Sequence, residues 1–210
     1  MAIKIKCLFA LTAIYLITIS SSCNKLGCAN TVYNFKISAK AYPDIDSIHI
    51  NDTLWLEINA PVNLTDITSN KIIDYSGAAN LGSALSFVKF TGGSVSDPGG
   101  VYSANSFMYF VVEGKQVINS FTDGIREFLF LENNNLYKFK VGVIPQQTGV
   151  FSIGFSNAAN VYRKSDNCTK AGFRINFENT NQHLYFLEMN RPGYVITGPD
   201  LTSTYYFKVY

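Results

Sequence analysis

Apolar and polar side chains alternate along most of the chain after residue 30. Tyr33, Phe35 and Ile37 are separated by polar residues, which is the period expected for a β-strand with one buried face. Similar short segments return at residues 54–58, 107–112, 126–131, 136–143, 151–155, 173–177 and 205–209. Glycine, proline and asparagine residues in the intervening stretches favour turns. The pattern therefore predicts an all-β fold, specifically an antiparallel β-sandwich.

Two of these segments support more specific predictions. Residues 107–112 are apolar at every position, so we expect a strand that is buried on both faces in the centre of a sheet. Residues 126–131 and 136–143 flank Glu132–Asn135, a stretch rich in asparagine, which accepts the left-handed backbone conformation of tight turns. These two arms therefore predict a β-hairpin.

One stretch near residues 180–189 has apolar residues at helical spacing. Asn179 or Thr180 is suited to cap a short helix there, and Pro192 would end it. A strand over residues 183–189 fits the same stretch nearly as well. The chain contains no internal repeat and no low-complexity linker. We therefore expect a single domain over residues 28–210, which is long enough to bury a substantial core.

The first 22 residues follow a different pattern. Lys4 and Lys6 precede a nearly unbroken apolar run that extends from Cys7 to Ile19. Three serines then lead to Cys23. Positive charge, an apolar segment and small residues before a cleavage point are the order found in a secretory signal. We predict a lipoprotein signal peptide over residues 1–22, lipidation at Cys23 and a short tether over residues 23–27. A plain secretory signal is the alternative, whereas a transmembrane helix would need about 20 apolar residues.

The segment around Cys23 resembles the N-terminus of cell-envelope lipoproteins of Bacteroidota. The lipobox of these proteins often departs from the usual leucine at the position of Ser20 here. Residues 44–56 and Gly149–Ile153 are similar to strands of Ig-like envelope modules. The resemblance implies an Ig-like β-sandwich anchored by its lipid, most often in the outer membrane. Asn24–Gly27 contains no acidic residue, which favours the periplasmic side. The membrane is then a partner through the anchor alone. Each methylene buried in the bilayer contributes about 0.8 kcal/mol to membrane binding, so several acyl chains hold the protein there without a membrane-binding surface on the domain.

The charge balance argues against polyanionic partners. The chain has 17 Lys and Arg residues and 15 Asp and Glu residues. Lys4 and Lys6 leave with the signal peptide, and residues 1–22 contain no acid, so 15 residues of each sign remain. Binding to nucleic acid or to anionic lipid headgroups depends on clustered positive charge. We therefore expect no nucleic-acid partner.

Two cysteines remain beyond the signal peptide and the lipidation site. Cys28 and Cys168 form an even pair in a compartment that is expected to be oxidising, which predicts a disulfide bond between them. Two free thiols are the alternative. The bridge would connect the start of the domain to a strand late in the chain.

The residues needed for catalysis or for holding metals are sparse. His49 and His183 are the only histidines, and no GxSxG, P-loop, CxxC or HxxxH pattern occurs. The acidic residues are scattered, and Asp44 and Asp46 are the pair closest to a calcium-binding loop, without an EF-hand pattern. We therefore predict no catalytic residue, no metal site and no cofactor, and a protein that is not an enzyme.

Trp55 is the only tryptophan and the one candidate ligand-binding residue. In the strand expected at residues 54–58 it shares a face with Glu57, opposite Leu54 and Leu56. An indole on an open face suits stacking on a sugar ring or gripping a partner, whereas a second layer would bury it. The leading hypothesis is a lipid-anchored envelope protein with a binding or structural role. The alternatives are a carbohydrate-binding lipoprotein of a polysaccharide-uptake system and an adhesion or assembly subunit.

Overall fold

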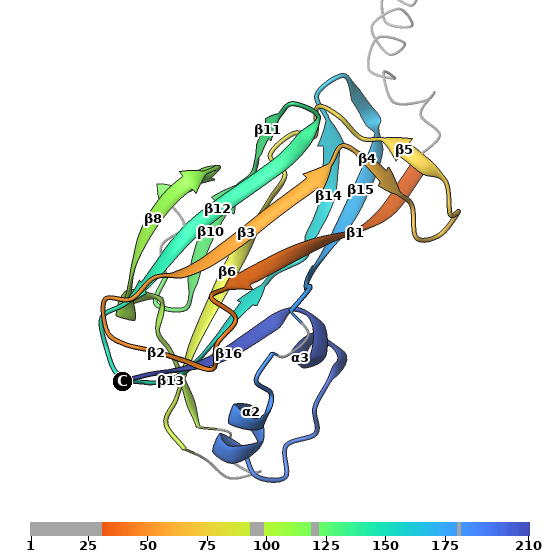
Figure 1. Ribbon diagram of the computed structural model, residues 1–210. Helices are drawn as coiled ribbons and strands as arrows, with labels where there is room; N and C mark the ends of the chain where they lie inside the picture. Colours follow the sequence, from red (N-terminus) through yellow and green to blue (C-terminus); the bar gives the residue numbers. More distant parts are fainter. Residues whose placement is uncertain (1–30, 93–98, 119–121, 180–181) are drawn as a thin grey trace, which may run out of the picture. The chain divides into compact units, whose positions relative to one another are not determined.

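The computed structural model describes residues 31–92, 99–118, 122–179 and 182–210, and Val32–Tyr210 forms one compact unit. Two β-sheets make up most of this unit, with a separate two-stranded sheet and short helices beside them (Figure 1). The predicted all-β sandwich is confirmed. The expected signal peptide, the tether and the start of the domain at residue 28 lie outside the described residues.

The first sheet is built from long strands. In spatial order they are β11 (Leu131–Asn133), β12 (Leu136–Pro145), β3 (Leu54–Pro61), β1 (Thr31–Tyr42), β15 (Asp166–Phe177) and β14 (Ala158–Arg163). A seventh strand, β8 (Phe107–Glu113), also pairs with β12.

The second sheet closes the other side of the core. Its order is β2 (Ser47–Ile48), β16 (Thr204–Val209), β13 (Gly149–Phe155), β6 (Gly82–Phe90), β10 (Ile125–Leu129) and β9 (Lys115–Gln116), and β7 (Gly100–Tyr102) pairs with β6. The two-stranded sheet consists of β4 (Asn63–Thr65) and β5 (Ile72–Asp74). Pairings with a described register are antiparallel as predicted, except that β2 and β16 run parallel.

The alternation in the sequence appears in the structure as inward and outward faces. In β3, Leu54, Leu56 and Ile58 are fully buried, whereas Trp55 and Glu57 lie on the opposite face. The other predicted inward positions behave in the same way: Phe35 and Ile37, Phe139 and Val141, Phe151 and Ile153, Phe173 and Ile175, and Tyr205 and Phe207 are all buried. Most strands therefore present one residue set to the core and another to the outside, whereas in β13 and β16 residues of the second face, such as Ser152 and Tyr206, are also buried.

Aromatic rings join the two sheets across the core. Three ring pairs that cross the interface are Phe107–Phe151 (centroids 5.0 Å apart), Phe139–Phe128 (5.3 Å) and Phe177–Phe155 (5.2 Å). The planes of these pairs are inclined by 72°, 59° and 55°, which suits the quadrupoles of the rings. Such pairs contribute about 0.5–1.5 kcal/mol each beyond the burial of their area.

The predicted hairpin forms, but its first arm is divided between the sheets. Asn134 and Asn135 have φ values of 52° and 60° and make the tight turn between β11 and β12, as expected. Residues 125–129 form β10 in the second sheet, so of the predicted first arm only β11 pairs with β12. The chain changes sheet at Phe130, whose N–H donates to the carbonyl of Leu81. Strands that bend from one sheet to the other are typical of sandwich corners.

The prediction of a central strand at residues 107–112 is wrong. β8 pairs with β12, and no other strand of the described residues pairs with it. Its inward residues Phe107 and Tyr109 pack on the core, whereas Met108, Phe110 and Val112 are 56%, 60% and 50% exposed. The strand is therefore apolar on both faces although it lies at an edge and one of those faces is exposed.

The helical segment is partly as expected. α2 (Tyr185–Asn190) falls at the end of the predicted stretch and stops before Pro192, but it begins later than a cap at Asn179 or Thr180 would require. The sequence reasoning missed α3 (Gly198–Thr202), although its capping box, formed by Thr197 and Asp200, is a recognisable signal. Among the described residues no helix has both the length and the hydropathy that a membrane span requires.

Candidate binding site

A row of residues crosses four strands on the outer face of the first sheet. Tyr42 in β1 lies opposite Trp55 in β3, Trp55 lies opposite Gly142 in β12, and Gly142 lies opposite Phe110 in β8. The four strands lie side by side in Figure 1. We name Tyr42, Trp55 and Phe110 the aromatic platform.

Gly142 leaves the space in which the indole of Trp55 lies. A Cβ atom at residue 142 would be 3.1 Å from Cζ3 and 3.4 Å from Cη2 of Trp55, and 2.8 Å from Cγ2 of Thr53. The six-membered part of the indole therefore lies close to the backbone of the neighbouring strand. Glycine within a strand commonly marks such a close approach. A larger residue at position 142 would displace the ring.

The three rings have defined relative orientations. The planes of Tyr42 and Trp55 differ by only 22°, with centroids 6.5 Å apart. The ring of Phe110 is inclined by 72° to the indole, with centroids 6.4 Å apart. Two nearly parallel rings beside a steeply inclined one can hold the flat face of a ligand while limiting its position.

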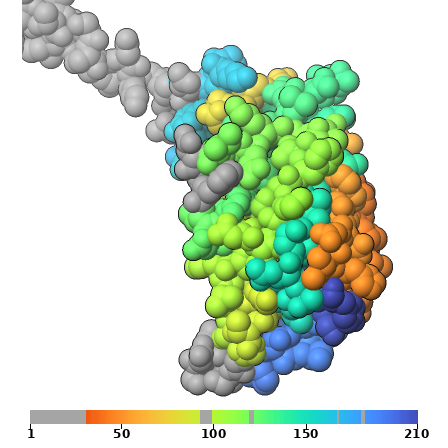
Figure 2. All heavy atoms as spheres, turned by 90° about the vertical axis from the view of Figure 1, so that its left-hand side faces the viewer, coloured from red at the N-terminus to blue at the C-terminus, as the bar shows by residue number. Residues whose placement is uncertain are grey.

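The platform is most open on the side of β8. Phe110 is 60% exposed, whereas Trp55 and Tyr42 are half-buried. Figure 2 views the molecule from this side and shows the residues around β8, in green, at the surface. Trp55 is thus neither sealed in the core nor fully exposed. Its neighbours hold the ring in place, so little side-chain freedom would be lost on binding.

Charged groups lie directly beside the rings. The hydroxyl of Tyr42 donates a hydrogen bond of 2.7 Å to Oε2 of Glu57, and Nζ of Lys140 lies 3.4 Å from the same oxygen. Nζ of Lys140 is also 5.4 Å from the ring centroids of both Tyr42 and Trp55. A cation at this distance from two rings is attracted by their negative faces. The platform is therefore bordered by an ion pair that contacts its rings.

The same contacts shift three pKa values. The hydrogen bond from Tyr42 lowers the pKa of Glu57, and Lys140 contributes in the same direction. The hydrogen bond with Tyr42 raises the pKa of Lys140, and partial burial raises the pKa of the Tyr42 hydroxyl. Carboxylate and ammonium are both charged at neutral pH, while the phenol stays protonated and can donate.

The cysteines predicted as modified residues are only partly within the structure. Cys23 and Cys28 lie outside the described residues. Cys168 lies in β15 and is disulfide-bonded. The pairing of Cys28 with Cys168 and the lipidation of Cys23 stay predictions.

The two histidines occupy different environments. His49 is exposed, and its Nδ1 lies 3.4 Å from Oδ2 of Asp52. His183 is buried, and its Nδ1 lies 2.9 Å from the carbonyl oxygen of Tyr206. Neither contact is that of a nucleophile with its base, which would join an imidazole to a hydroxyl or thiol.

The acidic pair near the start of the domain interacts with tyrosines. Oδ1 of Asp44 accepts a hydrogen bond of 3.2 Å from Tyr205, and Oδ2 of Asp46 accepts one of 2.6 Å from Tyr185. In the part of the chain that the structure describes, no three His, Cys, Asp or Glu side chains are close enough to hold a metal ion.

Sequence reasoning identified Trp55 and its position beside Glu57 but missed Tyr42, Phe110 and Lys140. These residues come from three other strands, and their positions around Trp55 follow from strand order and register. The single glycine within the apolar segment 136–143 was the only local signal, since glycine inside a strand suggests a close approach. A sequence alone does not say which ring fills that space.

Comparison of the chain with protein-family models, curated proteins and solved structures gave no match.

The charged border of the platform should stabilise the fold in a pH-dependent way. Glu57→Gln should lower the free energy of unfolding at pH 7 by at most about 1 kcal/mol, because the pair is partly exposed. Because the pKa of Glu57 is lower in the folded state than its ordinary value of 4.5, the charged carboxylate stabilises the fold above pH 4.5. This contribution is lost as the pH falls through the folded-state pKa. The difference between wild type and variant should therefore shrink below pH 4.5 in urea unfolding experiments.

Glu127→Gln is the matched control, because Glu127 is exposed on β10 and forms no ion pair within the described residues. It should leave the stability nearly unchanged at both ends of the pH range. A Glu57→Gln deficit that stays constant or grows on acidification would contradict the interpretation.

Proposed function

We propose that this protein is a lipid-anchored, non-enzymatic binding protein of the bacterial cell envelope that captures carbohydrate on the outer face of its first sheet. The observation that carries the proposal is the aromatic platform of Tyr42, Trp55 and Phe110. It combines ring faces with an ion pair at one border, and three different strands hold it.

The chemistry of a sugar matches this surface. A pyranose ring has apolar C–H faces and hydroxyl groups around its edge, so an aromatic ring contacts the face while nearby polar groups contact the edge. Binding sites generally combine apolar and aromatic lining with a few placed polar groups. Here the carboxylate of Glu57 and the ammonium of Lys140 lie within contact distance of the platform rings. Side chains on strands are also better preorganised than side chains on loops.

The sole tryptophan makes the proposal directly testable. Because Trp55 is the only tryptophan in the chain, its fluorescence reports on the platform and on nothing else. Titration with soluble glucan, xylan and mannan should produce a saturable change in emission with at least one of them. Tyr42→Ala and Phe110→Ala should each weaken binding about two- to tenfold, since a stacking contact contributes about 0.5–1.5 kcal/mol.

Tyr162→Ala is the matched control for these variants. Tyr162 is 40% exposed and lies on β14 at the far edge of the same sheet, so its removal should leave the affinity unchanged. Binding that is equally sensitive to Tyr162→Ala, or the absence of any response to all the polysaccharides, would contradict carbohydrate capture at the platform.

The anchor rests on the sequence of the first 23 residues. Lysines, an apolar run and three serines before Cys23 support a lipoprotein signal peptide, and the resemblance to Bacteroidota lipoproteins supports the outer membrane. The lack of acid in Asn24–Gly27 favours its periplasmic side. An oxidising envelope compartment also suits the predicted bridge between Cys28 and Cys168.

Substitution of the predicted lipidation site should release the protein. Cys23→Ala should abolish metabolic labelling with a tagged fatty acid and move the protein from the membrane fraction to the soluble fraction, because the sulfur at the predicted lipidation position is removed. Ser22→Ala keeps a small residue before the cysteine and should retain the label. Labelling that persists in Cys23→Ala would refute the anchor.

A second candidate function, self-assembly through strand addition, is favoured by β8. Edge strands usually carry lysine, proline or other protection against pairing, whereas residues 107–112 contain no charge and no proline. Two copies of β8 related by a two-fold axis at Phe110 would place Met108 opposite Val112 and Tyr109 opposite Val111. These inner pairs carry no charge, and only the outermost pair places a charged residue, Glu113, opposite Phe107, so a second copy of the chain is the occupant that fits this edge.

Strand addition would be blocked by a charge on this edge. Wild-type protein should then show a concentration-dependent dimer in analytical ultracentrifugation, and Val112→Lys should shift it to monomer. Val195→Lys, at an exposed position between α2 and α3, should leave the dimer intact. A wild-type protein that stays monomeric at all concentrations would rule this candidate out.

A further inference from the structure

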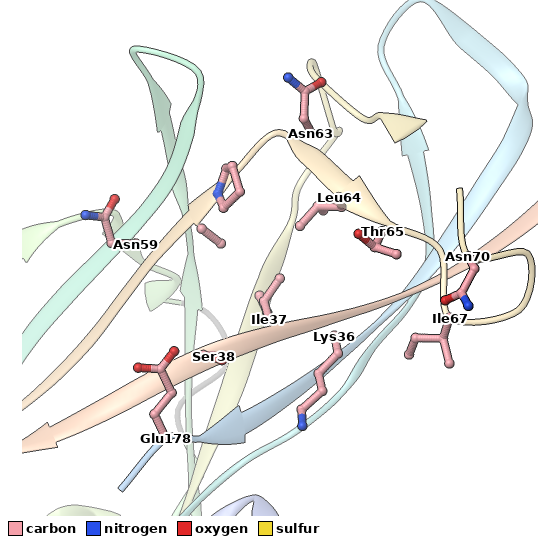
Figure 3. A pocket seen from close by; sticks show the side chains of 12 residues that line it. Lys36, Ile37, Ser38, Asn59, Asn63, Leu64, Thr65, Ile67, Asn70 and Glu178 are labelled. Carbon is pink, nitrogen blue, oxygen red and sulfur yellow. The ribbon is translucent and has the colours of Figure 1, made fainter. Parts of the chain in front are cut away.

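A pocket of about 490 Å³ lies on the same outer face as the aromatic platform. β1 and β3 form its floor, and β4 with the segment leading to β5 forms a wall beside them (Figure 3). Its polar lining residues include Asn59, Asn63, Asn70, Ser38 and Thr65. Ile67 adds an apolar side chain to the lining.

The pocket and the platform are two ends of one stripe. Trp55, Glu57 and Asn59 alternate with buried residues along β3, so they point to the same face. At about 3.4 Å per residue, the stripe from Trp55 to Asn59 is about 14 Å long. On β1, Tyr42 and Ser38 repeat this arrangement, one at the platform and one in the pocket. A single sugar ring cannot cover this distance, but an extended chain can.

The lining suits hydroxyl groups. A carboxamide offers both donors and an acceptor, and a hydroxyl offers both as well, which matches the dual character of a sugar hydroxyl. Asn59, Asn63 and Asn70 are exposed, and within the described ranges their carboxamides form no hydrogen bond to other protein groups. They are therefore available to a ligand without the loss of an internal bond.

The charges along the stripe are compensated in pairs except for Lys36, which lines the pocket and forms no ion pair within the described residues. Lys40 lies 3.3 Å from Glu178 at the pocket, and Lys140 lies 3.4 Å from Glu57 at the platform. Lys40 and Glu57 are also opposite each other in the pairing of β1 with β3. Alternating compensated charges favour a neutral ligand over a polyanion.

We infer that the pocket is a second subsite for a neutral, linear oligosaccharide, whose chain runs from the aromatic platform to Asn59 and Asn63. This inference rests on the proposed carbohydrate-binding function. The platform holds one sugar unit by contact with its face, and the pocket holds a later unit by hydrogen bonds to its edge. A chain that reaches both ends binds more tightly than a short one, because the second contact forms within an already bound ligand.

The test is a chain-length series. Oligosaccharides of increasing length, prepared from whichever neutral polysaccharide changes the Trp55 fluorescence, should bind with affinity that rises and then levels off once the chain spans the stripe. The double variant Asn59→Ala/Asn63→Ala should weaken binding of the long chains about tenfold and of the shortest less than about twofold, since two neutral hydrogen bonds are lost. Tyr42→Ala should instead weaken all lengths alike.

Asn133→Ala is the matched control, because Asn133 is an exposed asparagine on β11 of the same sheet, outside the pocket. It should leave the length dependence unchanged. Affinity that does not depend on length, while polysaccharide binding still requires Tyr42, would overturn the second subsite and leave the proposed function standing. Tighter binding of polygalacturonate than of any neutral chain would overturn the neutral ligand class. A lack of response to every polysaccharide would overturn both proposals.

Discussion

Aromatic rings from opposite sheets pack against each other across the core, and the arrangement of both sheets depends on this contact. Phe107 and Phe139 of the first sheet contact Phe151 and Phe128 of the second. Because protein interiors are close-packed, rings of this size set the separation of the sheets and the rotation of each strand about its axis. The strands that carry the inward rings also carry the outward side chains.

The candidate site is a geometric consequence of that constraint. With Phe139 and Val141 buried in β12, Lys140 and Gly142 must face outward, since successive side chains in a strand alternate. In β3 the burial of Leu54 and Leu56 directs Trp55 and Glu57 to the same outer face. The binding surface thus consists of the strand positions that do not face the core, and the strands that carry its rings hold them in place.

Local patterning predicted much of the fold because the inward positions are recognisable as apolar residues at every second position. The strands around Phe35, Leu56 and Phe207 follow from period-two alternation, and the turn at Asn134 follows from the tolerance of asparagine for positive φ. The errors also have physical causes. β8 was expected in the centre of a sheet because both of its faces are apolar. The sequence does not show whether an apolar outer face is covered or exposed. The chain crosses from β10 to β11 at Phe130, and no local signal marks a change of sheet.

By itself the sequence determined the all-β class, the inward residue of most strands and the place of Trp55 on an outward face, because each depends on alternation within a few residues. It also contains the whole basis for the predicted anchor at Cys23. Only the tertiary structure decided that Tyr42, Phe110 and Lys140 surround Trp55, and that Asn59 opens into a pocket on the same face. Those neighbours come from strands far apart in the chain, and strand order and register are set by packing across the whole core, which local sequence does not encode.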